Sequence, residues 1–132
     1  MSGPLPLSDP VGQLYAQLGE ETLAAIVRGF YARVAEHPLL RPMYPEQDLA
    51  PAEERLLLFL RGRFGGPPDY VEQRGHPRLR MRHAPFPIDR AARDAWMACM
   101  DHALDGVELE LQVQQTLRAF LDQVATFLIN RR

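Results

Sequence analysis

The sequence predicts an all-α domain, on two observations. Twelve prolines are spaced so that three long stretches, 11–37, 52–66 and 88–132, contain none, and each stretch has apolar side chains at the spacing of an amphipathic helix. No stretch shows the sustained alternation of a strand, and no hairpin turn joins two such runs. A chain of 132 residues forms one core. We therefore expect a single domain at 9–132 after a mobile leader at 1–8.

Two helices are expected before residue 38. Asp9 as N-cap and Pro10 at the first helical position begin a short helix, which Gly19 ends. The helix that follows ends just before Pro38 and has its arginines off the apolar stripe. Its stripe consists of Leu23, Ile26, Val27, Phe30, Tyr31 and Val34.

Three longer helices are expected after residue 50. Pro51 begins the first, and the run Gly65-Gly66-Pro67-Pro68 ends it. Asp89 caps the second, which Asp105-Gly106 ends, and the third extends from Leu109 toward the C-terminus. Their apolar stripes are Ala52, Leu56, Phe59 and Leu60; then Ala92, Ala95, Trp96, Cys99, Met100 and Ala103; then Leu109, Val113, Leu117, Phe120, Leu121, Val124, Phe127 and Leu128.

Two short helices are expected between residues 68 and 88. Asp69–Glu72 resembles a capping box, which opens the first. His76-Pro77 begins the second, and the run Pro85-Phe86-Pro87 ends it. His83 therefore lies in the last turn of this helix, four residues after Leu79 and on its apolar side.

Composition excludes several classes of chemistry. All 15 residues counted as Lys or Arg are arginines, so no lysine is available for a phosphate-binding loop or a Schiff base. Serine occurs only at Ser2 and Ser8, and the single Cys99 cannot form an internal disulfide, which fits a cytoplasmic setting. A net charge of −2 argues against nucleic acid as a partner, and no apolar run could span a membrane. Further chemistry would have to come from a cofactor.

Four histidines are candidates for a metal ligand. We expect His37 to act as a cation near a helix carboxyl end, His76 to cap a helix and His102 to face solvent. His83 differs because it lies on an apolar face, although the spacing alone also allows a buried structural histidine. No second residue with metal-site spacing accompanies it. A single histidine can hold a metal when a macrocycle supplies the other ligands, and haem is the common case.

Long ordered runs around His83 closely resemble the group II truncated haemoglobins. The runs are GGPPDY at 65–70, EQRGHPRLRMRHAPFPI at 72–88, DAW at 94–96, FYARV at 30–34, LLRPMYP at 39–45 and AEER at 52–55. The leader and the last helix share the resemblance only in a general way. The resemblance implies a shortened globin, in which a two-over-two helical sandwich encloses haem b.

The same resemblance implies roles for individual residues. His83 would be the iron ligand, with its second ring nitrogen donating to a backbone carbonyl or a water. Trp96 and Tyr31 would point protons at the bound ligand while Tyr44 completes a distal polar cluster. The distal-helix positions that face the ligand are Ala52 and Leu56, and a side chain as small as that of Ala52 would leave ligand entry open.

Four arginines lie within nine residues just before His83, where we expect the haem propionates. They are Arg74, Arg78, Arg80 and Arg82. A solvated basic face is the alternative for each of them, and our candidates for the propionates are Arg80 and Arg82. The expected haem contacts are completed by Phe59, Leu79 and Phe86.

The expected function is binding of O2, and of NO or CO, for ligand scavenging or redox chemistry. The first alternative is an NO dioxygenase or a peroxidase-like enzyme that acts on peroxide. Repeated turnover of NO would require a separate reductase, because the sequence resembles no flavin or nicotinamide domain. The second alternative is a haem-free helical interaction domain, in which His83, Tyr31 and Trp96 only pack.

Overall fold

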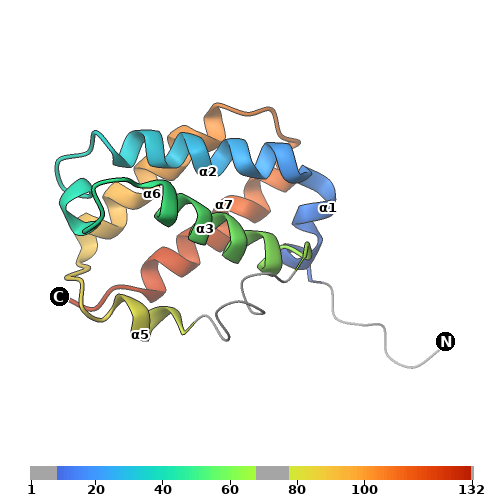
Figure 1. Ribbon diagram of the computed structural model, residues 1–132. Helices are drawn as coiled ribbons and strands as arrows, with labels where there is room; N and C mark the ends of the chain where they lie inside the picture. The colour runs from blue at the N-terminus through green and yellow to red at the C-terminus, as the bar shows by residue number, and fades with distance from the viewer. Residues whose placement is uncertain (1–8, 68–77, 132) are drawn as a thin grey trace, which may run out of the picture.

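Helices form all of the regular secondary structure in the residues that the structure describes, 9–67 and 78–131. Figure 1 shows the computed structural model. Its elements are η1 (Val11–Gln13), α1 (Leu14–Leu18), α2 (Glu20–Val34), η2 (Arg41–Met43), α3 (Ala50–Arg63), α5 (Leu79–His83), α6 (Arg90–Asp105) and α7 (Leu111–Phe127), where η denotes a 3-10 turn. No helix within these ranges is long and apolar enough to cross a membrane. The all-α prediction is confirmed.

The four long helices form two packed pairs. α2 packs against α3 in one pair, and α6 packs against α7 in the other. The pairs meet chiefly where α2 lies against α6. Figure 1 shows this two-over-two arrangement, with α5 at one end of the sandwich beside the C-terminal residues. The predicted architecture is therefore the observed one.

The predicted apolar stripes meet inside the sandwich. All six stripe residues of α2 are buried, and the ring of Phe30 packs edge-on against Trp96 of α6, with the ring centroids 5.0 Å apart. α7 contributes the fully buried Leu117 and Leu121. Burying one such side chain stabilises the fold by about 1.5–3 kcal/mol. The core thus fixes α2 relative to α6 and α7.

The predicted helix boundaries at Gly19 and Asp89 are confirmed, whereas the one at Asp9 is wrong by one residue. The first turn is 3-10 and begins at Val11 with Pro10 as its N-cap, although the Asp9 carboxylate accepts a hydrogen bond from the Gly12 amide at 3.1 Å. Gly19 has φ +81°, a conformation that separates α1 from α2. Asp89 accepts from the Ala92 amide at 2.8 Å and begins α6.

Gly65 permits a close approach between the end of α3 and the first turn of the described chain. Its φ is +94°, and a Cβ at this position would lie 2.1 Å from the Gly12 carbonyl oxygen. Next to it, the Tyr15 amide donates to the Phe64 carbonyl at 2.8 Å. Only glycine accommodates both the left-handed backbone and this contact.

The predicted start of the helix that carries His83 is wrong by two residues. α5 begins at Leu79 rather than at Pro77. The reason is that Arg78 has φ 48° and ψ 52°, a left-handed conformation that cannot lie inside a right-handed helix. The expected leader at 1–8, the capping box at Asp69–Glu72 and the predicted cap His76 lie outside the described residues.

The last helix also departs from its prediction. α7 begins at Leu111 rather than at Leu109, because Glu110 has an extended backbone with ψ 144°. Phe127 lies at the end of this helix and is 54% exposed, so it does not face the core as its stripe position suggested. Instead, the guanidinium carbon of Arg80 lies 5.3 Å from the centre of the Phe127 ring. This contact is a cation–π interaction between α5 and α7.

Candidate functional site

A cavity of about 500 Å³ lies between the two helix pairs and α5. Its wall includes every site residue predicted from the sequence except Arg80. The predicted residues on it are Tyr31, Tyr44, Ala52, Leu56, Phe59, Leu79, Arg82, His83, Phe86 and Trp96. The volume is that of a small-molecule or cofactor site. Residues from five separate segments of the sequence therefore meet at one cavity.

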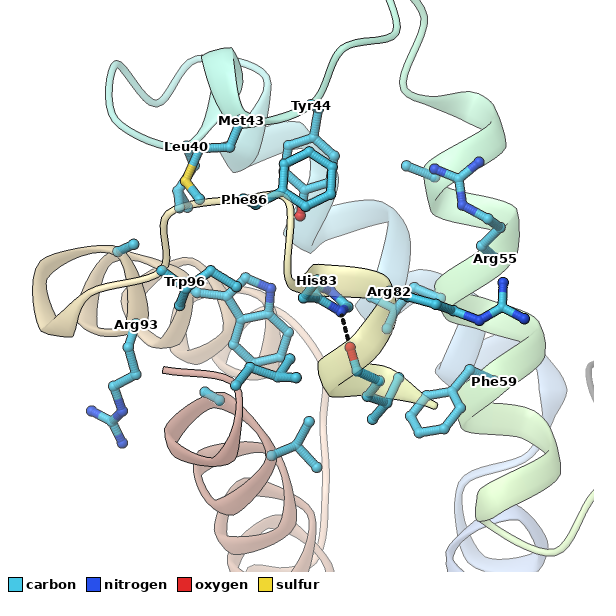
Figure 2. Close-up of a pocket in the computed structure, with 18 of the residues that line it drawn as sticks. Leu40, Met43, Tyr44, Arg55, Phe59, Arg82, His83, Phe86, Arg93 and Trp96 are labelled. Carbon is cyan, nitrogen blue, oxygen red and sulfur yellow. Dashed lines mark hydrogen bonds between the residues drawn. The ribbon is translucent and has the colours of Figure 1, made fainter. Parts of the chain in front are cut away.

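The imidazole of His83 is oriented by its own helix. Its Nδ1 lies 2.7 Å from the carbonyl oxygen of Leu79, one turn earlier in α5. A carbonyl oxygen can only accept, so Nδ1 carries the ring proton and Nε2 keeps its lone pair. Figure 2 shows this bond and the His83 ring on the cavity wall. Of the two partners predicted for the second ring nitrogen, a backbone carbonyl or a water, the structure has the backbone carbonyl. Nε2 can then bind a metal.

Asn130 holds the segment around His83 from the other end of the chain. Its side-chain amide donates to the carbonyl oxygens of Phe86 at 2.9 Å and His83 at 3.3 Å. Its Oδ1 accepts from the Ile88 amide at 2.8 Å. Sequence reasoning missed this residue, because 47 positions separate it from His83 and no local pattern connects them.

Tyr31, Tyr44 and Trp96 form a hydrogen-bonded cluster on the cavity wall. The rings of Tyr31 and Tyr44 are edge-on, with centroids 5.7 Å apart. Burial raises the pKa of the Tyr31 phenol far above its usual range, and the charge and hydrogen bond of Tyr44 add to this. Burial also raises the pKa of Tyr44, while hydrogen bonds with Tyr31 and Trp96 act in the opposite direction. Both phenols are therefore protonated near neutral pH.

Tyr44 occupies the centre of this cluster. The Trp96 indole can only donate, so the Tyr44 oxygen accepts from it, whereas either phenol can donate in the contact between Tyr31 and Tyr44. Two phenols that share one hydrogen bond leave one phenol proton that the cluster itself does not use. Figure 2 shows the Trp96 indole directed toward the space between Tyr44 and His83. The cluster can supply hydrogen-bond donors to a ligand in the cavity.

Ala52 and Leu56 share one face of α3, as their spacing predicted. Ala52 is buried and Leu56 is half-buried, and both line the cavity. Neither side chain has a polar atom. Hydrogen bonding to a ligand in the cavity therefore falls to the cluster of Tyr31, Tyr44 and Trp96.

Arginines lie on two sides of the cavity. Figure 2 shows Arg55 of α3 and Arg82 of α5 on one side, and Arg93 of α6 on the opposite side. Arg93 is paired with Asp94 at 2.8 Å and with Asp122 of α7, so it joins two helices. Sequence reasoning identified Arg82 but missed Arg55, although Arg55 lies inside the run AEER. Arg55 already pairs with Glu46 at 2.6 Å through Nη2, so its remaining N–H donors, together with the guanidinium of Arg82, can pair with the carboxylates of a bound molecule.

The other described histidines do not reach the cavity wall. His102 is exposed, as predicted. His37, which we expected to act near the helix carboxyl end, contacts backbone amides instead: its Nδ1 accepts hydrogen bonds from the amides of Leu39 at 3.2 Å and Leu40 at 3.4 Å.

These features fit haem. The cavity offers one imidazole nitrogen with a lone pair, mostly apolar walls, and two guanidinium groups on one side. In the ranges 9–67 and 78–131, no three His, Cys, Asp or Glu side chains gather as a metal site. A metal at His83 therefore depends on a macrocycle for its remaining ligands.

Comparison with known proteins decides the family. Residues 13–130 match the family described as bacterial-like globin. The group 2 truncated hemoglobin YjbI of Bacillus subtilis is 44% identical over 117 residues, which is 89% of this chain and 88% of that protein. Two-on-two hemoglobin-3 of Arabidopsis thaliana is 31% identical over 119 residues, covering 88% and 68% of the two chains. The chain is a group II truncated haemoglobin of the bacterial-like globin family.

Solved structures agree with this assignment. A thermostable haemoglobin from Thermobifida fusca has a TM-score of 0.87 and 49% identity, covering 89% of this chain and 97% of its own. A truncated oxygen-avid haemoglobin from Bacillus subtilis has a TM-score of 0.85 and 44% identity, covering 89% and 99%. This truncated haemoglobin therefore binds haem, and a small gaseous ligand such as O2 binds at the haem.

Proposed function

We propose that this truncated haemoglobin holds O2 at a polar distal site and releases it slowly, for scavenging or redox use rather than delivery. The observation that supports the proposal most directly is the cluster of Tyr31, Tyr44 and Trp96 on the wall of the cavity that His83 also lines. O2 bound beside an entirely apolar wall would receive no hydrogen bond from the protein. The Bacillus subtilis relative described as oxygen-avid is consistent with slow release.

The cofactor is held by residues from both sides of the cavity. We assign His83 Nε2 as the iron ligand and Phe59, Leu79 and Phe86 as apolar contacts. For the propionates we assign Arg82 and, in place of Arg80, the cavity-lining Arg55. The guanidinium of Arg80 lies over Phe127 instead. Arginine suits this task because its planar guanidinium binds a carboxylate with two donors.

The distal residues act by donating hydrogen bonds. His83 would hold haem, which would supply iron for binding a diatomic ligand. Because the single N–H of Trp96 is donated to Tyr44, the donor left for such a ligand is a phenol hydroxyl, and we assign it to Tyr44 rather than to Tyr31, with Trp96 and Tyr31 supporting Tyr44. Each charge-assisted hydrogen bond contributes about 1.5–3 kcal/mol, which corresponds to a roughly 10- to 150-fold slower dissociation.

NO and CO are further ligands under this proposal, because they are diatomic and would reach the same cavity. Multiple turnover of NO, or a peroxidase-like reaction with peroxide, would make the protein an enzyme. Returning the iron to the ferrous state after NO oxidation would require a separate reductase. A cytoplasmic location belongs to the same proposal, since the single thiol, Cys99, is free and buried.

Reconstitution with haemin tests the haem site. We expect the wild-type protein to give a Soret band typical of a histidine-ligated haem, and His83→Ala to lose it until free imidazole is added. His102→Ala is the matched control, because this histidine is exposed on α6 and away from the cavity. An unchanged spectrum in His83→Ala without imidazole would contradict the assignment of the iron ligand.

Slow release and catalysis are tested on the oxygenated protein. Rapid mixing with a competing ligand measures the O2 dissociation rate, and fast release in the wild-type protein would contradict retention. Mixing with NO and a reductant then separates binder from enzyme. One equivalent of NO consumed per haem supports a binder, whereas many equivalents support the NO dioxygenase.

A further inference from the structure

The position of Tyr44 depends on a segment without regular structure. Tyr44 follows the turn η2, and residues 44–49 connect this turn to α3. Within this segment Pro45 has no amide proton to donate, and the Tyr44 amide reaches the Arg41 carbonyl at 3.2 Å. A short irregular segment of this kind needs contacts from side chains to hold one conformation.

Arg41 supplies those contacts. Its Nη1 donates to the Tyr44 carbonyl oxygen at 3.1 Å. Its Nη2 donates to the carbonyl oxygens of Glu46 and Gln47, both at 2.8 Å. One half-buried guanidinium therefore holds three carbonyls of the segment that carries Tyr44, and the fixed fork of the guanidinium sets their relative positions.

Glu46 attaches the same segment to α3. Its Oε1 accepts from Arg55 Nη2 at 2.6 Å, and this hydrogen bond lowers the pKa of Glu46. Its Oε2, by contrast, is buried and has no hydrogen-bond partner among the described residues. A buried oxygen without a donor is unfavourable. The segment that carries Tyr44 is therefore held by two arginines, Arg41 through backbone carbonyl oxygens and Arg55 of α3 through Glu46.

The hydroxyl of Tyr44 is sensitive to this placement. Its oxygen accepts from the Trp96 indole and its ring lies edge-on to that of Tyr31, and hydrogen bonds weaken steeply when donor and acceptor move out of line. The side chains of Tyr31 and Trp96 come from the packed helices α2 and α6, whereas Tyr44 comes from the irregular segment. Tyr44 is thus the member of the cluster whose backbone lies outside the packed helices, although its ring packs against the core.

We propose that Arg41 is a positioning residue. By holding the segment that carries Tyr44, it keeps the Tyr44 hydroxyl where this group can donate to the ligand. The proposal rests on the proposed role of Tyr44 as a distal donor. Arg41 lies outside the cavity wall and does not itself contact the ligand or the haem under this proposal. Its effect on the ligand passes through the backbone of residues 44–47.

The test is a double-mutant cycle on the haem-loaded protein with Arg41→Met, Tyr44→Phe and the two combined. We expect Arg41→Met to raise the O2 dissociation rate by about 3- to 10-fold, less than loss of the donor itself, because the hydroxyl is displaced and not removed. In the Tyr44→Phe background the same change should have no further effect. An equal effect of Arg41→Met in both backgrounds, or none in either, would overturn the proposal.

A spectroscopic readout separates positioning from general loosening of the fold. The C–O stretching frequency of the CO complex responds to hydrogen-bond donors near the ligand. We expect Arg41→Met to shift it in the same direction as Tyr44→Phe, and Arg41→Lys to restore part of the shift. Arg33→Met, an exposed arginine near the end of α2, is the control and should leave the frequency unchanged.

Failure of this inference can be distinguished from failure of the proposed function. If Tyr44→Phe alone changes neither the O2 dissociation rate nor the CO frequency, the role of Tyr44 as a donor is wrong. If Tyr44→Phe changes both and folded Arg41→Met changes neither, only the role of Arg41 is wrong. If Arg41→Met does not fold, Arg41→Lys and Arg41→Gln replace it in the double-mutant cycle. Effects on the O2 dissociation rate that add to that of Tyr44→Phe would then overturn the role of Arg41.

Discussion

The two walls of the haem cavity are built in different ways. The distal wall takes Tyr31 from α2 and Trp96 from α6, long helices that pack against each other in the core. The proximal wall takes His83 from α5, a helix of five residues, none of which is buried. Beyond its own backbone hydrogen bonds, this proximal segment is held by Asn130 and by the Arg80–Phe127 contact.

This difference indicates that the apolar core orders one wall of the cavity and that the cofactor orders the other. Side chains on packed helices are placed by the apolar core, whether or not a cofactor is present. A short helix with little buried surface gains much of its order from what it binds, because bound molecules stabilise the state that binds them. We therefore expect the distal wall to be formed in advance and the proximal wall to depend on haem.

Removing haem should produce the largest contrast between the walls. We expect hydrogen exchange of the α5 amides to accelerate by about 100-fold or more, because haem binding through His83 stabilises this helix directly. Amides of α2 and α6 should change much less. Exchange measured by mass spectrometry on the haem-loaded and haem-free proteins checks this. Equal acceleration in α2 and α5 would show that the two walls do not differ.

Trp96→Phe should affect the ligand while sparing the cofactor. Phenylalanine keeps an aromatic contact with Phe30 but removes the indole N–H that Tyr44 accepts. We expect the O2 dissociation rate to rise by up to roughly 10-fold, because Tyr44 loses the partner that orients its hydroxyl, with haem affinity nearly unchanged. Stopped-flow kinetics and haem titration measure the two quantities.

A matched control for Trp96→Phe is Tyr15→Phe, because the Tyr15 hydroxyl bonds to Glu20 and does not reach the cavity wall. This control should leave the O2 dissociation rate unchanged. Loss of haem affinity in Trp96→Phe comparable to that in His83→Ala would show that the distal wall also holds the cofactor.

The smallest expected effect concerns an ion pair between α2 and α3. Arg61 of α3 donates to both carboxylate oxygens of Glu20 of α2, at 2.8 and 2.7 Å, and this pairing lowers the pKa of Glu20. A lowered pKa means that the carboxylate stabilises the folded state above the ordinary Glu pKa of about 4.3 and loses this effect as the pH falls through the folded value. Because Glu20 is partly exposed, the contribution is below about 1 kcal/mol.

Urea denaturation of the haem-free protein tests this link. Glu20→Gln should be less stable than wild type near pH 7, and the difference should shrink as the pH is lowered from about 5 toward 3. Glu21→Gln is the control, because Glu21 is its exposed neighbour on α2. If the difference in unfolding free energy between Glu20→Gln and wild type does not change with pH, the charges of Arg61 and Glu20 do not stabilise the packing of α2 against α3.

Local rules correctly predicted the features that depend on neighbours in sequence. The proline-free stretches and the period of apolar residues located the long helices, and Asp89 was identified as a cap because the amide it binds is three residues away. His83 was identified by its apolar face together with the resemblance of the surrounding runs. The boundary errors at Leu79 and Leu111 arose where one residue, Arg78 or Glu110, adopts a non-helical backbone without a glycine or proline to signal it.

The sequence by itself determined the helices, the family, the imidazole and the aromatic residues of the cavity, because these follow from spacing and residue type along the chain. Only the tertiary structure decided that Asn130 holds the His83 segment, that Arg55 and not Arg80 lies on the cavity wall, and that Tyr44 accepts the hydrogen bond of Trp96. The physical reason is that these contacts join distant segments. Their partners are selected by how the helices pack, which no local pattern encodes.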